Sequence, residues 1–209
     1  MTEDYKYWEK RPKDDERKDW RNGCDTWIGE YWKSRNHPHR SLIISAIEKF
    51  SIVKSLLEIG CNCGPNLANI KEAFPGITLA GIDANQHAIT RGRRSIKDVD
   101  FTLGDLLHLP WPDKSFDIVL SDAVLMYVGR KDAPTAIMEM ERVCRRGIIL
   151  IEWLSPSLMG SIINHHWARN YPELLKRLKF KVETYELTKA DWPHDTWVKN
   201  GRLFIAHRA

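Results

Sequence analysis

The sequence predicts an α/β fold, built as a doubly wound, seven-stranded sheet with six parallel strands and one antiparallel strand. From residue 55 onward, short apolar runs alternate with segments of helical periodicity, which is typical of a parallel sheet with helices on both faces. Two of the early apolar runs carry an acid at or near their ends, Glu58 and Asp83. The last two runs are separated by turn residues without a helical pattern, which predicts an antiparallel pair.

Residues 1–54 are predicted to form an N-terminal leader and a helical lid. Charges of both signs alternate through residues 1–21, and the aromatic side chains among them could anchor this leader to the rest of the protein. Residues 25–50 have helical spacing, with a break at His37-Pro38-His39-Arg40. We expect the segment through Arg40 to close over a ligand site and to exclude water from it.

Residues 55–209 are predicted to form the core, and the whole chain is long enough for one domain with a sizeable interior. The expected strands cover residues 55–59, 77–82, 99–103, 116–121, 147–152, 180–187 and 202–208. The expected helices cover residues 65–73, 86–95, 132–143 and 169–178.

Composition excludes several classes of protein. Of the 209 residues, 43% are hydrophobic and 29% are charged, which is typical of a globular protein, and no segment reaches the ~18 apolar residues of a membrane span. The N-terminus has no apolar signal region, so we expect a cytoplasmic protein. A net charge of +4 permits nucleic-acid binding without arguing for it. Four cysteines are too few for a disulfide framework, and Cys61 and Cys63 lack the further ligands of a metal site, so we expect no metal.

The most informative stretch runs from Leu56 to Leu67, where a buried strand leads through a glycine turn into a helix. Gly60 and Gly64 have no Cβ, so a ligand can approach the backbone, and Asn62 between them tolerates a positive φ. A dinucleotide fingerprint would need two further glycines, and a phosphate-binding P-loop would need Gly-Lys-Ser/Thr after the second glycine. The remaining pattern is E-x-G-x-x-x-G.

Two later segments extend this pattern. Residues 77–83 form a second apolar run that ends in Asp83, where a carboxylate can accept hydrogen bonds from both hydroxyls of a ribose. Residues 104–120 read GDLLHLPWPDKSFDIVL. The three segments, in this order and at this spacing, resemble the class I S-adenosylmethionine (SAM)-dependent methyltransferases with a type 11/12/25-like domain. The resemblance covers residues 41–153 well and the remainder loosely.

The resemblance implies a Rossmann-like fold, SAM as the cofactor and S-adenosylhomocysteine (SAH) as its product. In this family the acid after the third strand binds the adenine amino group, which implies this role for Asp105. Arg40 could pair with the methionine carboxylate of SAM. The residues expected to bind the cofactor are Glu58, Gly60, Cys61, Asn62, Gly64, Asp83, Ala84, Asp105, Leu106, Ser121 and Arg40.

Methyl transfer from a sulfonium is a direct displacement, so few residues are obligatory beyond those that align the reactants and remove a proton. Asp122 could act as a base or position the substrate, or it could only cap the following helix. His165 and His166 are further candidate bases, or solvated loop residues. Residues that could line an acceptor pocket, or simply pack the core, are Trp27, Tyr31, Tyr127, Trp153, Trp167 and Arg169.

The sequence after the fourth strand narrows the choice of acceptor. Residues 121–127, SDAVLMY, lack the D/N-P-P-Y/F motif of enzymes that methylate base amino groups and the Pro-Cys nucleophile of cytosine C5 methylation. The leading hypothesis is a methyltransferase that acts on oxygen or nitrogen of a small molecule. One alternative is the same domain acting on RNA or a protein side chain, and another is a SAM-binding partner subunit without catalysis.

Overall fold

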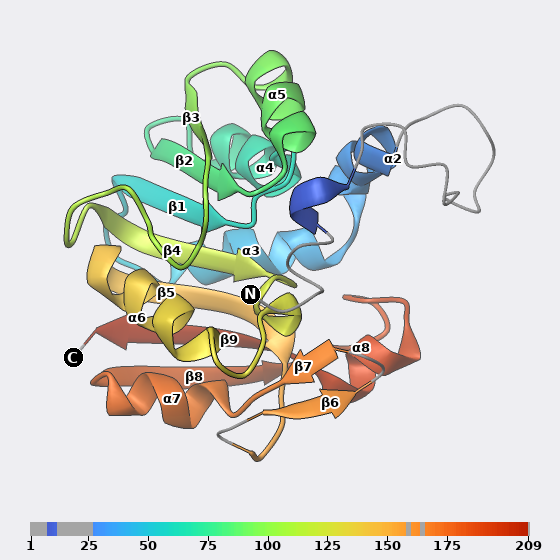
Figure 1. The fold of residues 1–209 in the computed structure, drawn as a ribbon, viewed down its shortest axis with the longest axis vertical. Coiled ribbons are helices and arrows are strands. Elements are labelled where there is room, and N and C mark those ends of the chain that lie inside the picture. Colours follow the sequence, from blue (N-terminus) through green and yellow to red (C-terminus); the bar gives the residue numbers. More distant parts are fainter. Residues whose placement is uncertain (1–7, 12–26, 158–159, 164–165, 209) are drawn as a thin grey trace.

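The computed structural model describes residues 8–11, 27–157, 160–163 and 166–208 (Figure 1). A central seven-stranded sheet has the order β3-β2-β1-β4-β5-β9-β8. β9 is antiparallel to both of its neighbours, and the other six strands share one direction, which confirms the predicted sheet. The strands are β1 (Ser55–Ile59), β2 (Thr78–Asp83), β3 (Val99–Leu103), β4 (Phe116–Asp122), β5 (Cys144–Trp153), β8 (Phe180–Glu186) and β9 (Gly201–Arg208).

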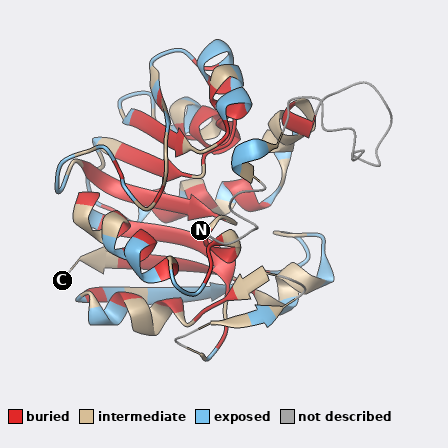
Figure 2. Ribbon diagram, viewed as in Figure 1, coloured by how far each residue is buried: buried red, intermediate tan, exposed pale blue. Residues whose placement is uncertain are grey.

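Helices cover both faces of the sheet, because its inner strands are apolar on alternate sides. In β1, Leu57 and Ile59 face one core, and Leu56 faces the other. The first core is closed by α6 (Ala133–Val143) and α7 (Tyr171–Arg177). The second is closed by α3 (His39–Glu48), α4 (Pro65–Ala73) and α5 (Gln86–Ser95). Figure 2 shows the resulting burial of the strands between the helical layers.

The described part of the N-terminal region packs beside the carboxyl ends of the strands. It contains α2 (Trp27–Lys33), the 3-10 turn η1 (Ser34–Asn36) and a short helical stretch at residues 8–10. The break between α2 and α3 falls at His37-Pro38, and α3 begins at His39, inside the predicted four-residue break. Much of the predicted leader lies outside the described residues.

Three elements were not predicted. The chain between β8 and β9 contains α8 (Asp195–Asn200), so the expectation of no helix there is wrong. Its short length and the preceding Pro193 concealed it, although the His194 side chain accepts a hydrogen bond from the backbone N–H of Thr196, as an N-cap does. The other two, β6 (Ser161–Ile163) and β7 (His166–Ala168), pair as an antiparallel hairpin after β5.

Among the residues that the structure describes, no helix is long and apolar enough to cross a membrane.

Candidate functional site

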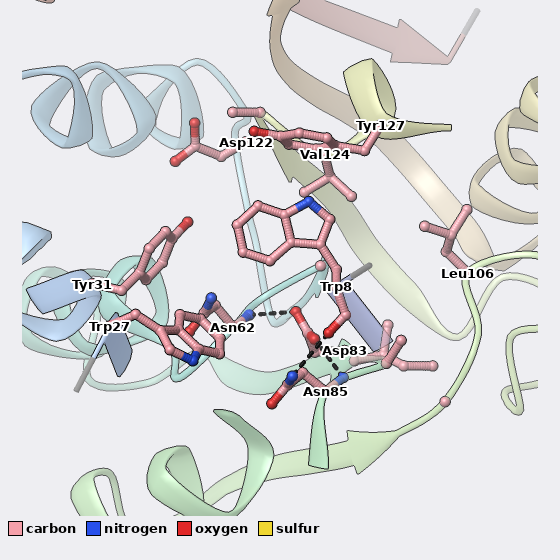
Figure 3. A pocket seen from close by; sticks show the side chains of 15 residues that line it. Trp8, Trp27, Tyr31, Asn62, Asp83, Asn85, Leu106, Asp122, Val124 and Tyr127 are labelled. Atoms are coloured by element: carbon pink, nitrogen blue, oxygen red, sulfur yellow. Dashed lines mark hydrogen bonds between the residues drawn. The ribbon is translucent and has the colours of Figure 1, made fainter. Parts of the chain in front are cut away.

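A cavity of about 160 Å³ opens beyond the carboxyl ends of β1, β2, β3 and β4, with the N-terminal aromatic side chains as its other wall (Figure 3). Ligands of open α/β sheets bind at this edge, where the strand order reverses between β1 and β4. The residues that line it are Trp8, Trp27, Tyr31, Gly60, Asn62, Ile82, Asp83, Ala84, Asn85, Gly104, Leu106, Asp122, Ala123, Val124 and Tyr127.

The glycine turn after β1 has the left-handed backbone that its sequence predicts. Gly60, Asn62 and Gly64 have φ values of 62°, 50° and 82°. A Cβ on Gly60 would lie 2.4 Å from the nearer methyl carbon of Val124, so the turn and the segment after β4 approach each other in a way that only glycine permits. Gly60 therefore brings bare backbone to the floor of the cavity.

Asp83 joins this turn to the end of β2. Its carboxylate accepts the backbone N–H groups of Asn62 and Asn85, each at 2.8 Å. Burial raises the pKa of Asp83, and these backbone hydrogen bonds oppose the rise. The Asp83 carboxylate lies at the cavity, where a ligand hydroxyl could donate to it (Figure 3).

Aromatic rings form the wall opposite the glycine turn. Trp8 packs edge to face against Trp27 and Tyr127, with ring centroids 6.0 and 5.3 Å apart. Its indole projects into the cavity between the Asp83 side and the Val124 side (Figure 3). The Asn85 amide holds this segment by donating to the carbonyl oxygens of Trp8 and Arg11 at 2.8 and 2.9 Å. Residues distant in sequence thus complete one apolar wall.

A buried polar network lies behind the cavity. Oδ2 of Asp122 is 2.9 Å from Nε2 of His39, accepts from the Asn66 amide at 2.9 Å, and lies 3.5 Å from the Arg40 guanidinium. The Asn66 amide also donates to Oε1 of Glu58 at 2.7 Å. Oε2 of Glu58 and Oδ1 of Asp122 are buried and make no hydrogen bond within the described part of the chain. Two carboxylate oxygens therefore stay open to a ligand.

The two acids of this network are held in different charge states. Burial raises the pKa of Glu58 to about 8, because the single Asn66 hydrogen bond does not offset desolvation. Burial also acts on Asp122, but His39, Arg40 and Asn66 outweigh it and hold its pKa well below the usual value. At neutral pH Asp122 is ionised, and Glu58 is mostly protonated until a cation binds beside it.

Nine of the predicted site residues line one cavity. The structure brings together Gly60, Asn62, Asp83, Ala84, Leu106, Asp122, Trp27, Tyr31 and Tyr127. Glu58 lies just behind the cavity through Asn66. Asp105 is turned back, since its carboxylate accepts the backbone N–H of Leu107, while its neighbours Gly104 and Leu106 face the cavity.

Other predicted binding residues have structural contacts instead. Arg40 does not line the cavity, because its guanidinium is bound to Asn66, to Asp122 and to the carbonyl and hydroxyl oxygens of Ser34. Ser121 donates to Glu152 at 2.9 Å. Two further predicted residues pack away from the cavity, Cys61 in the core that faces α4 and Gly64 against the Phe101 ring.

The predicted acceptor and base residues after β5 also lie outside the lining. Arg169 is 2% exposed and donates to the carbonyl oxygens of Leu125 and Val128, so it fixes the loop after β4. Trp153 is buried, and Trp167 packs over Arg169. His166 contacts the rings of Tyr127 and Trp153 behind the wall. His165 lies outside the described residues.

Sequence reasoning missed several lining residues, of which Trp8 and Asn85 matter most. Trp8 stood out only as one of several aromatics in a polar leader. Asn85 follows Asp83 by two residues and precedes a helix, and this spacing is the N-cap signal that could have identified it. Its second role, the hold on residues 8–11, depends on a contact more than 70 residues away in the sequence.

Comparison with known proteins agrees with this geometry. Residues 57–151 match the family model described as "Methyltransferase domain". A fatty-acid O-methyltransferase of Mycolicibacterium smegmatis is 35% identical over 96 residues, which cover 45% of this chain and 34% of that protein. A demethylmenaquinone methyltransferase of Lactobacillus johnsonii is 29% identical over 142 residues, covering 62% and 57%. The chain thus spans less than two thirds of either relative.

Among solved structures, a magnesium protoporphyrin IX methyltransferase from Synechocystis, crystallised with bound SAM, superimposes with a TM-score of 0.67 at 14% identity. The match covers 100% of this chain and 99% of that one, and it establishes a shared fold. The family match and the fold confirm the predicted resemblance, and the chain belongs to the class I SAM-dependent methyltransferases.

Proposed function

We propose that this protein binds SAM in the cavity beyond β1–β4 and transfers its methyl group to oxygen or nitrogen of a small molecule. The observation that carries the proposal is the pair of buried, unpartnered carboxylate oxygens, on Glu58 and Asp122, beside a glycine turn of bare backbone. A buried carboxylate oxygen without a donor is costly, so the site is built for a ligand that supplies one.

The residues present fit the parts of SAM. Asp83 would accept hydrogen bonds from the ribose hydroxyls. Oε2 of Glu58 would receive the ammonium of the methionine moiety, a contact that favours ionisation of this acid. Gly104 and Leu106 would form the side of the cavity that meets adenine, and Arg40 would act indirectly by ordering Asn66.

Bound SAM supplies an electrophilic methyl group on a sulfonium, and the leaving sulfur departs as the neutral thioether of SAH. This chain would align the acceptor with the methyl carbon, exclude water through Trp8 and Trp27, and accept a proton. Oδ1 of Asp122 is the base that we propose, since it is ionised, lines the cavity and lacks a partner in the described chain. It would take the proton as the new bond makes the attacking atom positive.

Support for a small acceptor comes from the aromatic wall. Trp8, Trp27 and Tyr127 narrow the approach to the cavity, which suits a small molecule better than a polymer. The relatives include O- and N-methyltransferases, among them a norajmaline N-methyltransferase of Rauvolfia serpentina. The alternatives are RNA or a protein side chain as acceptor, and binding without turnover.

Calorimetric titration with SAM and SAH tests the first step, and transfer of labelled methyl into metabolite, RNA and peptide pools tests the second. Saturable binding that fails in Asp83→Ala but survives in Asp100→Ala, an exposed acid on β3, supports the site. Label in the metabolite pool supports a small acceptor. Label only in RNA or peptides, or binding without any transfer, would replace the proposal with the corresponding alternative.

A further inference from the structure

A second set of side chains sits directly behind Asp122 and touches neither the cavity nor the glycine turn. His39, at the start of α3, is 3% exposed, and its Nε2 lies 2.9 Å from Oδ2 of Asp122. Its other ring nitrogen, Nδ1, lies 2.5 Å from Nδ1 of His37. A buried histidine therefore bridges the acid at the cavity and a half-buried histidine nearer the surface.

The hydrogen-bond pattern assigns the direction of each contact. Nδ1 of His37 also lies 3.4 Å from the backbone N–H of His39, which can only donate. His37 is thus the acceptor in this turn, and His39 donates to it from Nδ1. Burial and the adjacent His39 and Arg40 lower the pKa of His37 to about 4, so its acceptor nitrogen is free of a proton at neutral pH. His39 then donates from Nε2 to the Asp122 carboxylate.

Aromatic stacking fixes the His39 ring in this position. The Trp192 ring lies on it with centroids 4.1 Å apart and planes 26° apart, and Trp197 stacks on Trp192 at 3.8 Å and 10°. His37 contacts the same Trp192 ring at 5.0 Å. The segment between β8 and β9, far from the cavity motifs in sequence, thereby orients a histidine that orients Asp122.

Because His39, Arg40 and Asn66 all meet Asp122 at Oδ2, Oδ1 is left open. We propose that His39 is a positioning residue for the methyltransferase reaction: backed by His37 and Trp192, it occupies Oδ2 so that an ionised Oδ1 faces the acceptor. This inference rests on the proposed function. The acceptor lone pair attacks the methyl carbon, the sulfur keeps the electrons of the broken bond, and Oδ1 takes the acceptor proton, which later passes to solvent.

Several ionisable groups act on this pair from neighbouring elements. Arg40 on α3 stabilises the carboxylate. Glu58 on β1 and Glu152 on β5 interact unfavourably with its charge, as does the Tyr31 hydroxyl on α2 if it ionises. Without His39, the raised pKa that burial favours for Asp122 would oppose only Arg40 and Asn66, so the carboxyl would titrate at a higher pH.

The test uses the full chain with SAH bound and ¹³C-labelled aspartate carboxyls, with the Asp122 resonance assigned through Asp122→Asn. The wild-type signal is expected to stay ionised from pH 5 to 9. In His39→Phe, which keeps a ring for Trp192, the midpoint is expected to rise by at least about one pH unit. His39→Gln keeps a donor without charge and gives a smaller rise, and the exposed His87→Gln serves as the control. If His39→Phe does not fold, His39→Gln alone decides.

SAH affinity should change less than twofold in the His39 variants. With the acceptor found by the labelled-methyl screen, kcat of His39→Phe should fall at least tenfold at pH 6 and recover toward pH 8, with KM for SAM unchanged. An Asp122 signal that titrates alike in wild type and both His39 variants overturns the inference, as does loss of SAH binding with unchanged titration. A wild-type protein that binds neither SAM nor SAH rejects the proposed function instead.

Discussion

The carboxyl ends of β4 and β5 each carry a buried acid, and the two acids are used in opposite ways. Glu152, in β5, is fully buried and accepts hydrogen bonds from the Ser121 hydroxyl and the backbone N–H groups of Val124, Leu125 and Met126. Asp122, at the end of β4, has its three contacts on one oxygen and none on the other. The acid in β5 is filled by the protein itself, and the acid in β4 is left for a ligand.

This difference shows how a strand-end acid acquires its role. Glu152 closes the loop after β4, and that loop carries Ala123, Val124 and Tyr127 into the cavity wall. The structural acid thus holds the chain against which a ligand at Asp122 would pack. The number of donors that the chain itself supplies, more than the position on the sheet, separates support from binding.

The largest effect should come from removing the filled acid. In Glu152→Ala, three backbone N–H groups and a hydroxyl lose their buried acceptor, and the free energy of unfolding is expected to fall by about 4 kcal/mol. Urea unfolding followed by circular dichroism measures this. Glu152→Gln keeps one acceptor oxygen and should cost roughly half as much.

Glu186→Ala on β8 is the surface control, since that side chain is 83% exposed and its ion pair with Arg202 contributes at most about 1 kcal/mol. If Glu152→Ala were no more destabilising than Glu186→Ala, the contrast between the two strand ends would be lost.

The sequence was sufficient for the sheet and for the acids at its edge, because both depend on local patterns. Apolar runs of strand length, the glycine turn and the acids Glu58 and Asp83 can be read without knowing what they contact. The role of Arg40 or Arg169 cannot be read this way. Arg169 donates to carbonyl oxygens 44 and 41 residues away, and Arg40 to an amide 26 residues away. An arginine that binds a ligand and one that fixes a loop look alike until the fold brings their partners near.

Asp83 should give the next largest effect, because it lies between the two extremes. Its carboxylate accepts two backbone N–H groups and also lines the cavity. Asp83→Ala removes the proposed ribose contacts, each of which contributes about 1.5–3 kcal/mol, so the Kd for SAM should rise at least tenfold to a hundredfold. Calorimetry measures this.

Asp83→Asn keeps one acceptor oxygen for the glycine turn, so it separates loss of the ligand contact from loosening of the turn. An unchanged Kd in both variants would show that Asp83 does not contact the ligand.

Glu58 sharpens the comparison through pH. The unfolded chain loses the Glu58 proton near its ordinary pKa of 4.5, and the folded protein keeps it until about pH 8. Between these values the folded state binds more protons, so rising pH favours unfolding, by about 1.4 kcal/mol per pH unit for this group. Stability measured from pH 5 to 8 should therefore decline more steeply in wild type than in Glu58→Gln.

Glu152 and His37 titrate in both proteins, so their contributions cancel in the difference. SAM should also release a proton on binding to wild type at pH 7, as its ammonium ionises Glu58, and this release should vanish in Glu58→Gln. Calorimetry in buffers of different ionisation enthalpy detects it. Parallel stability curves together with equal proton release would mean that the open oxygen of Glu58 is not a ligand contact.

The smallest effect should come from the aromatic wall, where the protein has covered the open side of the cavity with its own N-terminal segment. Trp8 makes edge-to-face contacts with Trp27 and Tyr127, each worth about 0.5–1.5 kcal/mol. Removing residues 1–40 would also remove His39 and Arg40 from the buried Asp122, so Trp8→Ala is the cleaner change. It should raise the Kd for SAM three- to tenfold and leave the free energy of unfolding within about 1 kcal/mol.

Tyr185→Ala, on β8, is the matched loss of a ring away from the cavity and should leave the Kd unchanged. If residues 1–40 form a lid over bound cofactor, SAH should slow proteolysis of this segment in wild type and much less in Trp8→Ala. Cleavage at the same rate with and without SAH would mean that Trp8 is a fixed part of the wall. In that case the open oxygens of Glu58 and Asp122 would be reached through a permanent opening.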